Sequence, residues 1–124
     1  MRRISIFVVG IIVIAVLLPL TGAAAETPKE TWQAASEQVI LRLLSQPTTD
    51  AIYEYYGQYR QYWRPEVLGI QKVPQSPYYE VIIQVETFYG AHNPPYGLET
   101  ITFYIDPMGE AQLVHFDHQE EPDK

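Results

Sequence analysis

Hydrophobic residues recur with two different periods along the chain. Between residues 28 and 46 apolar side chains recur every three or four positions, which places them on one face of a helix. From residue 67 onward the period shortens to two, which is typical of strands with one buried face. The stripe of the first segment consists of Trp32, Ala35, Val39, Ile40, Leu43 and Leu44.

Two helices are predicted from capping and stop residues. The sequence Thr27-Pro28-Lys29-Glu30 forms a capping box with proline at the first helical position, so a first helix begins here and ends at Gln46-Pro47. A second, short helix begins at Thr48 or Thr49 and ends at Gly57, which tolerates the left-handed conformation. We expect Ile52, Tyr55 and Tyr56 to form its apolar side.

Four strands are predicted at 67–73, 78–88, 99–105 and 110–117. Before the first strand, 59–65 is an aromatic connector in which Pro65 favours extended backbone at Arg64. The turn Asp106-Pro107-Met108-Gly109 joins the last two strands as a hairpin, and the charged tail from Gln119 is expected to fray.

The order of two helices followed by four strands predicts an α+β fold. An antiparallel sheet with one apolar face needs a cover, so we expect the first helix to pack on the face that carries Val81, Ile83 and Val85. The predicted architecture is a curved four-stranded antiparallel sheet with an N-terminal helix and a short second helix. By analogy alone it is cystatin-like or nuclear-transport-factor-like.

The first 25 residues have the layout of a secretion signal. Arg2 and Arg3 precede an apolar run from Ile4 to Leu20, and Ala23-x-Ala25 fits the rule for signal peptidase. We expect cleavage after Ala25, which leaves a single domain from 26 to 124, secreted or at the cell surface. The alternative is an uncleaved membrane anchor formed by residues 4–20, since about 17 residues reach the lower limit for a membrane span.

Charge and composition exclude several classes of function. The chain has 15 Asp and Glu against 8 Lys and Arg, for a net charge of −7, and two of its arginines lie in the signal. Nucleic acid and anionic lipid surfaces are therefore poor partners, because both are bound mainly through Lys and Arg. Because cysteine is absent, disulfides, thiolate metal sites, cysteine nucleophiles and lipoprotein attachment are excluded as well.

Several stretches support a resemblance to a known family. The chain resembles the small exported proteins of Bacillus-like bacteria grouped as domain of unknown function 3888. The resemblance covers roughly residues 39–116 and implies a Gram-positive exported protein without assigned activity, so no catalytic residues are carried over. The stretches are Tyr55-Tyr56-Gly57, Arg60-Gln61-Tyr62-Trp63-Arg64-Pro65, Ser76-Pro77-Tyr78-Tyr79-Glu80-Val81, Val85-Glu86-Thr87-Phe88 and Gly90-Ala91-His92-Asn93-Pro94-Pro95-Tyr96-Gly97-Leu98-Glu99-Thr100-Ile101-Thr102-Phe103.

The loop expected at 90–97 is the first candidate site. It contains His92, Asn93 and Tyr96 and is flanked by Glu86 and Glu99. If the flanking strands pair, the two carboxylates would meet His92 at the base of the loop, a set suited to a divalent cation. The alternative is a rigid turn in which the histidine and asparagine bond to backbone and the glutamates are solvated.

Aromatic residues between 53 and 63, interleaved with arginines, are the second candidate site. Tyr62, Trp63 and Arg64 suit stacking against a carbohydrate or a peptide. The alternative is that these residues only cover the open end of a small sheet.

Catalytic templates are poorly represented. None of the serines after residue 26 lies in a G-x-S-x-G elbow, and the chain has no H-E-x-x-H, phosphate loop or dinucleotide fingerprint. His115, on the side of Leu113, and His118 are interpreted as structural. We expect a non-enzymatic binding module for a peptide, glycan or protein partner, with no cofactor except a possible divalent cation. The alternatives are a small hydrolase or isomerase-like enzyme, or a divalent-ion-binding domain, that uses His92 with Glu86 or Glu99.

Overall fold

The computed structural model describes residues 28–122, so the expected signal segment, its cleavage site and the Thr27 cap lie outside the described residues. Two helices precede four strands, as the α+β prediction requires. The elements are α1 (Pro28–Leu43), α2 (Ser45–Tyr56), β1 (Gln61–Lys72), β2 (Tyr79–Tyr89), β3 (Asn93–Ile105) and β4 (Ala111–Glu121). No helix within this range is long and apolar enough to cross a membrane.

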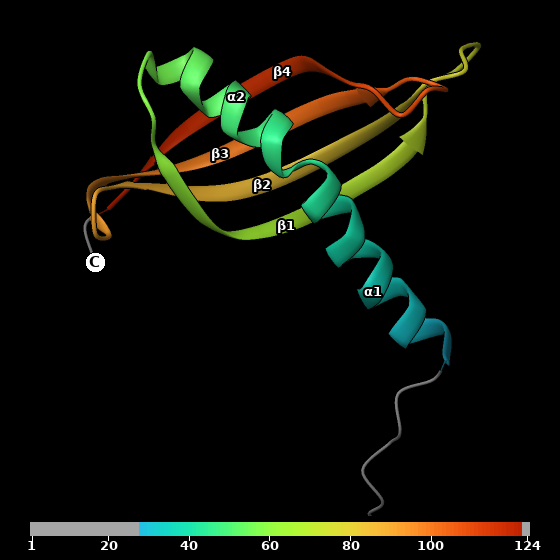
Figure 1. The fold of residues 1–124 in the computed structure, drawn as a ribbon, viewed down its shortest axis with the longest axis horizontal. Coiled ribbons are helices and arrows are strands. Elements are labelled where there is room, and N and C mark those ends of the chain that lie inside the picture. The colour runs from blue at the N-terminus through green and yellow to red at the C-terminus, as the bar shows by residue number, and fades with distance from the viewer. Residues whose placement is uncertain (1–27, 123–124) are drawn as a thin grey trace, which may run out of the picture.

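The four strands form one antiparallel sheet in the order β1-β2-β3-β4. Helix α2 lies across one face of this sheet, whereas α1 projects beyond the β1 edge (Figure 1). We call the face under α2 the helix-covered face and the other the open face. The hydrophobic core lies between α2 and the helix-covered face, and its buried members are Leu41, Leu44, Ala51, Ile52, Val81, Ile83, Val85, Ile101 and Phe103.

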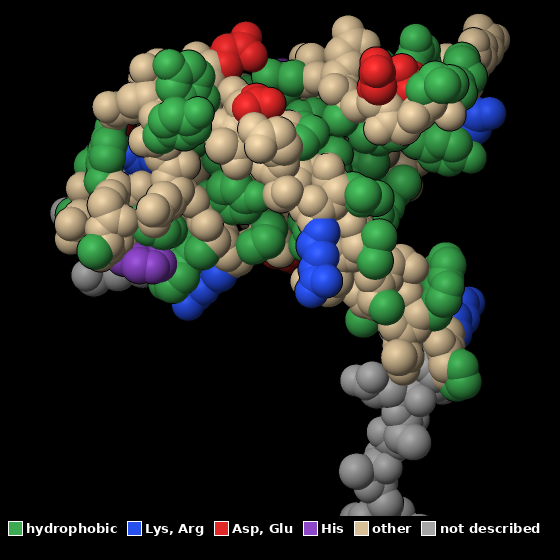
Figure 2. Space-filling model, viewed as in Figure 1, with side chains coloured by type: hydrophobic (Ala, Val, Ile, Leu, Met, Phe, Trp, Pro, Cys, Tyr) green, Lys and Arg blue, Asp and Glu red, His purple; other side chains and the backbone are tan. Residues whose placement is uncertain are grey.

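The predicted face of the sheet is the covered one, but α2 provides most of the cover. Helix α1 reaches the core only near its end, through Leu41 and the partly buried Ile40, while Leu43 stays 74% exposed. The rest of α1 projects from the body of the domain (Figure 2). In α2 the small or compact side chains of Thr48, Ala51 and Ile52 are buried, and their spacing puts them on one helical face. Tyr55 is 50% exposed, contrary to expectation, and its ring stacks on that of Phe116 in β4 at 4.7 Å.

The boundary between the helices lies earlier than predicted. Leu44 interrupts the helix with φ −90° and ψ 3°, and α2 begins at Ser45. Pro47 therefore lies in the first turn of α2, where its missing N–H breaks no helical hydrogen bond. Gly57, with φ 71°, ends α2 as predicted.

Three strands are longer than their period-two patterns indicate. Strand β1 begins at Gln61 and includes most of the predicted connector, since register shifts at Trp63/Glu66 and Val67/Gly69 interrupt the alternation. Arg64 has φ 49° at the first shift, so the expected extended backbone is wrong. Strand β3 begins at Asn93, which reduces the predicted loop at 90–97 to a turn of residues 90–92.

The hairpin of β3 and β4 confirms the predicted turn and corrects the predicted tail. Asp106 Oδ1 accepts hydrogen bonds from the backbone N–H groups of Met108 and Glu110, both at 2.9 Å. The tail does not fray at Gln119, because β4 pairs with β3 as far as Glu121. One register shift between Thr102 and Phe103 gives β4 an extra residue. After it Phe116, not His115, packs against the core with Leu113.

Candidate functional site

Glu99 is a fully buried carboxylate on the helix-covered face of β3. It lies opposite Val85 in the register and two residues before Ile101, so it points into the core. Its Oε1 accepts hydrogen bonds from the Thr87 hydroxyl at 3.0 Å and from the Tyr56 hydroxyl. His118 Nδ1 lies 2.9 Å from both carboxylate oxygens. We call these four residues, Tyr56, Thr87, Glu99 and His118, the Glu99 cluster.

The cluster joins the end of α2 to three strands. Tyr56 is the last residue of α2, and His118 lies directly opposite Glu99 in the pairing of β3 with β4. Gly97 makes the room: a Cβ at this position would overlap Glu99 Oε1, the Thr87 hydroxyl and the Tyr56 hydroxyl. Only glycine therefore fits beside the carboxylate.

The protonation of the cluster follows from its contacts. Burial, followed by the hydrogen bond to Glu99, raises the pKa of Tyr56 far above its ordinary value of 10, so its hydroxyl stays protonated and donates. Nδ1 of His118 lies 2.9 Å from both carboxylate oxygens, which can only accept, so Nδ1 carries a proton and donates to Glu99.

A histidine oriented by a carboxylate is also the arrangement of acid–base catalysis. Here, however, the hydroxyls of Tyr56 and Thr87 both donate to Glu99, so neither is positioned to attack a substrate. The His118 side chain is 21% exposed and lies beside the rings of Tyr55 and Tyr56. The geometry is that of a satisfied buried polar network that anchors the end of β4.

The predicted meeting of Glu86, His92 and Glu99 is wrong. Glu86 lies opposite Leu98 while Glu99 lies opposite Val85, so the two carboxylates point to opposite faces of the sheet. Both are buried, which also contradicts the alternative of solvated glutamates. Within residues 28–122, no group of three or more His, Asp or Glu is placed to hold a metal ion.

His92 stacks on the open face of the sheet. Its ring lies 3.9 Å from that of Phe88 at an interplanar angle of 13°, and 4.4 Å from Trp63. The backbone of His92 has φ 63°, and its carbonyl accepts a hydrogen bond from the Tyr96 hydroxyl at 2.7 Å. Asn93 and Tyr96 belong to β3. The turn at 90–92 is thus folded back onto the open face by aromatic packing.

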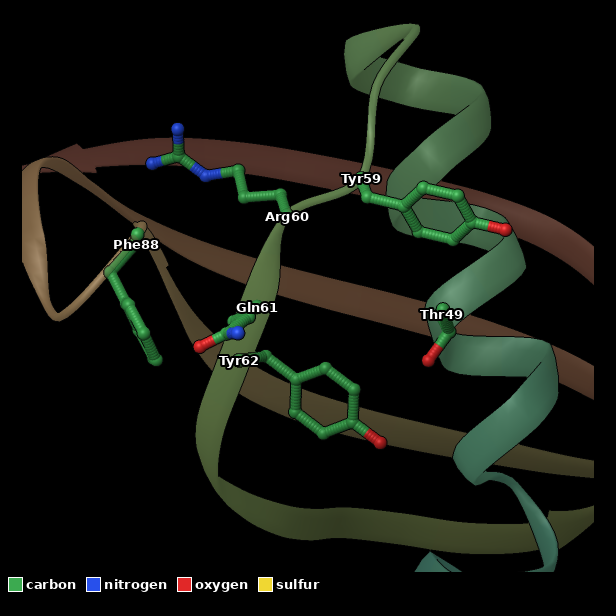
Figure 3. A pocket seen from close by; sticks show the side chains of 7 residues that line it. Thr49, Tyr59, Arg60, Gln61, Tyr62 and Phe88 are labelled. Carbon is green, nitrogen blue, oxygen red and sulfur yellow. The ribbon is translucent and has the colours of Figure 1, made fainter.

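An open hollow of about 620 Å³ lies between α2 and the first residues of β1. In Figure 3 the rings of Tyr59 and Tyr62 both extend toward Thr49 of α2. Tyr59 is 80% exposed. We call this the Tyr59 hollow; its lining residues are Thr49, Tyr59, Arg60, Gln61, Tyr62, Phe88 and Gly90.

Arg60 links the Tyr59 hollow to the Glu99 cluster. Its guanidinium lies 4.5 Å from the ring centre of Tyr56 and 4.3 Å from that of Tyr89. Nη2 donates a hydrogen bond to the carbonyl of Pro95, while Nε is buried without a hydrogen-bond partner. The residue as a whole is only 6% exposed.

The candidates from the aromatic segment separate onto two faces. Tyr62 lines the hollow, where burial raises its pKa, whereas Trp63 packs against Phe88 and His92 on the open face. Arg64 lies over the Trp63 ring at 4.5 Å. Sequence reasoning missed the importance of Arg60, although it lies inside the aromatic segment that was singled out.

Comparison with known proteins gives one match. A family model described as "Protein of unknown function (DUF3888)" matches residues 36–120. The matched range contains the Glu99 cluster and every residue that lines the Tyr59 hollow. No curated protein and no solved structure matches the chain.

Proposed function

Since the chain belongs to the DUF3888 family, whose description assigns no activity, we propose a function from the geometry: a non-enzymatic binding module that holds a glycan in the Tyr59 hollow. The observation that carries the proposal is the pair of tyrosines at this hollow, one of them 80% exposed. The volume of about 620 Å³ lies within the range of small-ligand sites.

The lining favours a sugar over a peptide. The faces of Tyr59 and Tyr62 are suited to the C–H faces of a pyranose ring. The Gln61 amide can donate to and accept from sugar hydroxyls, and the Thr49 hydroxyl, which donates to the Ser45 carbonyl, can accept. None of the seven lining residues is aliphatic, so an apolar peptide side chain such as leucine would find no matching pocket. A peptide or a protein partner is the alternative occupant.

Binding without catalysis is supported by what lines the hollow. None of its seven lining residues is Asp, Glu, His, Ser, Cys or Lys, the usual acids, bases and nucleophiles. The Glu99–His118 pair lies in the Glu99 cluster, where Glu99 is fully buried. The alternative of a small hydrolase or isomerase therefore has no carboxylate, histidine or lysine among the lining residues of the hollow.

The glycan would belong to the cell surface if the protein is exported. The layout of residues 1–25 supports export by a signal that is cleaved after Ala25. A Gram-positive, Bacillus-like bacterium as the source is what the family resemblance implies. An anchor formed by residues 4–20 would instead keep the domain at the membrane. N-terminal sequencing of the exported protein distinguishes the two, because cleavage gives Glu26 as the first residue.

The proposal is tested by titrating the domain of residues 26–124 with oligosaccharides of glucose, N-acetylglucosamine and glucuronic acid. The readout is the change in the amide chemical shifts of the protein. We expect shifts at residues 59–62 and at least about tenfold weaker binding by Tyr59→Ala. Tyr79→Ala is the matched control, since Tyr79 is an exposed tyrosine at the far end of β2. Binding that survives Tyr59→Ala unchanged, shifts confined to another surface, or cleavage of the sugars would contradict the proposal.

A further inference from the structure

The charge around the Tyr59 hollow is opposite to that of the chain. The protein carries 15 acidic residues and 8 Lys and Arg, yet the only charged residue among the seven that line the hollow is Arg60. In Figure 3 the Arg60 side chain starts just before β1 and extends toward the turn between β2 and β3, away from the rings of Tyr59 and Tyr62. An acidic domain therefore places an arginine in the wall of its ligand-sized hollow, with the guanidinium packed against Tyr56 and Tyr89.

Arg60 has no carboxylate of its own. Within residues 28–122 no Asp or Glu lies within ion-pair distance of its guanidinium, and the ion pair found there joins Glu99 to His118. The two tyrosine rings and the Pro95 carbonyl compensate part of the buried charge, but Nε has no hydrogen-bond partner. A guanidinium buried with an unused donor is unfavourable until an acceptor is supplied.

Glu99 does not fill this role, although Tyr56 contacts both residues. Oε1 accepts from Tyr56 and Thr87, and His118 Nδ1 lies 2.9 Å from both oxygens. The oxygens of the carboxylate are thus already bonded within the Glu99 cluster. The charge of Arg60 is left for a group that comes from outside the chain.

We propose that the ligand of the Tyr59 hollow is an acidic sugar and that Arg60 binds its carboxylate. This inference rests on the proposed function and adds the ligand's charge to it. The planar guanidinium matches a carboxylate in two parallel hydrogen bonds. Turning the side chain toward the hollow gives up the bond to Pro95 and the contacts with the rings of Tyr56 and Tyr89, and gains two charge-assisted hydrogen bonds, one of them made by the Nε that is unpaired in the free protein.

Three sugars that differ only at carbon 6 test the inference: glucose, glucuronate and glucose 6-phosphate, each titrated at millimolar concentration with amide chemical shifts as the readout. We expect glucuronate to bind at least about tenfold more tightly than glucose. Arg60→Gln should weaken the binding of glucuronate at least about tenfold more than that of glucose, and thereby remove this preference. Arg64→Gln removes the same charge from the open face and should keep the preference.

The fold of Arg60→Gln is checked by its amide spectrum, since Arg60 is buried. If that variant does not fold, the wild-type protein carries the test: the preference for glucuronate should shrink as salt rises from about 0.01 M to about 1 M, and a preference that does not change overturns the inference. Equal binding of glucose and glucuronate at residues 59–62 overturns the inference and leaves the proposed function standing. A preference for the phosphate over glucuronate overturns the carboxylate assignment, and no shift at the hollow with any sugar overturns both.

Discussion

Glu99 of β3 and His118 of β4 face each other across the sheet, with Nδ1 of the histidine 2.9 Å from both carboxylate oxygens. The pair brings a wholly buried negative charge and its partner together near the C-terminal end of an edge strand. Tyr56 adds the end of α2 to the same carboxylate. One buried group thus fastens a helix end and the last strand to the sheet.

Replacing Glu99 by glutamine should therefore destabilise the domain strongly. Removal of one partner from a buried pair leaves the other without compensation, and we expect the free energy of unfolding to fall by about 3 kcal/mol. Urea denaturation measures it, with Glu120→Gln on the exposed side of β4 as the control, expected to change stability by less than about 0.5 kcal/mol. Equal stability of the two variants would show that the Glu99 cluster contributes nothing.

Gly97→Ala should lower stability for a different reason. Its Cβ would overlap the carboxylate of Glu99 and two hydroxyls, so the cluster must move, at a cost of about 1–3 kcal/mol. Gly69→Ala is the matched control, because the space around its Cβ is open and Gly69 also lies in a strand. Denaturation curves for both variants decide the matter; a Gly97→Ala protein as stable as Gly69→Ala would contradict the close packing.

The raised pKa of Tyr56 predicts a loss of stability in alkali. Above pH about 10 a tyrosine of the unfolded chain ionises while Tyr56 of the folded protein stays protonated, so the unfolded state binds fewer protons and stability falls as pH rises. The contribution is fully present below pH 10 and decreases above it. Unfolding free energies between pH 8 and 12 should fall less steeply for Tyr56→Phe than for the wild type, whereas Tyr79→Phe should keep the wild-type slope. A Tyr56→Phe slope equal to that of the wild type would refute this origin.

The unequal roles of the two helices can also be measured. Ile52→Ala should reduce stability by about 2–5 kcal/mol, because Ile52 is fully buried against the sheet. Leu43→Ala in α1 removes a similar side chain that is 74% exposed and should cost less than about 0.5 kcal/mol. The reverse order of effects would mean that α1 is the main cover of the core.

Local sequence signals predicted the parts of the fold that depend on local chemistry. The Asp106 carboxylate accepts two backbone hydrogen bonds and Gly109 adopts a positive φ, and the β3–β4 hairpin follows from this turn. Helical spacing, in contrast, indicates which residues of a helix are apolar but not which of two consecutive helices meets the sheet. The small side chains of Thr48 and Ala51 let α2 approach the sheet closely, and this makes α2 the helix that covers the core.

The candidate site was predicted less well, because it depends on register. The alternation in β3 already placed Glu99 on the same face as Ile101 and Phe103, so its burial could have been inferred. Its separation from Glu86 follows from the same alternation. Glu86 pairs with Leu98, which precedes Glu99 in β3, and adjacent residues of a strand point to opposite faces. Binding of a ligand by the aromatic segment that contains Tyr62 stays a prediction.

The extra residue in β4 determines which side chain lies opposite Glu99 in the pairing of β3 with β4. Pairing counted from Ile105 and Ala111 without interruption would put Asp117 opposite Glu99, two carboxylates facing each other inside the protein. The shift between Thr102 and Phe103 moves every later residue of β4 by one position, and a histidine takes the place of that aspartate. The single inserted residue thereby replaces a repulsive contact between two carboxylates by an attractive contact between a carboxylate and a histidine. Loss of this register shift would bring Asp117 opposite Glu99 and make the contact repulsive.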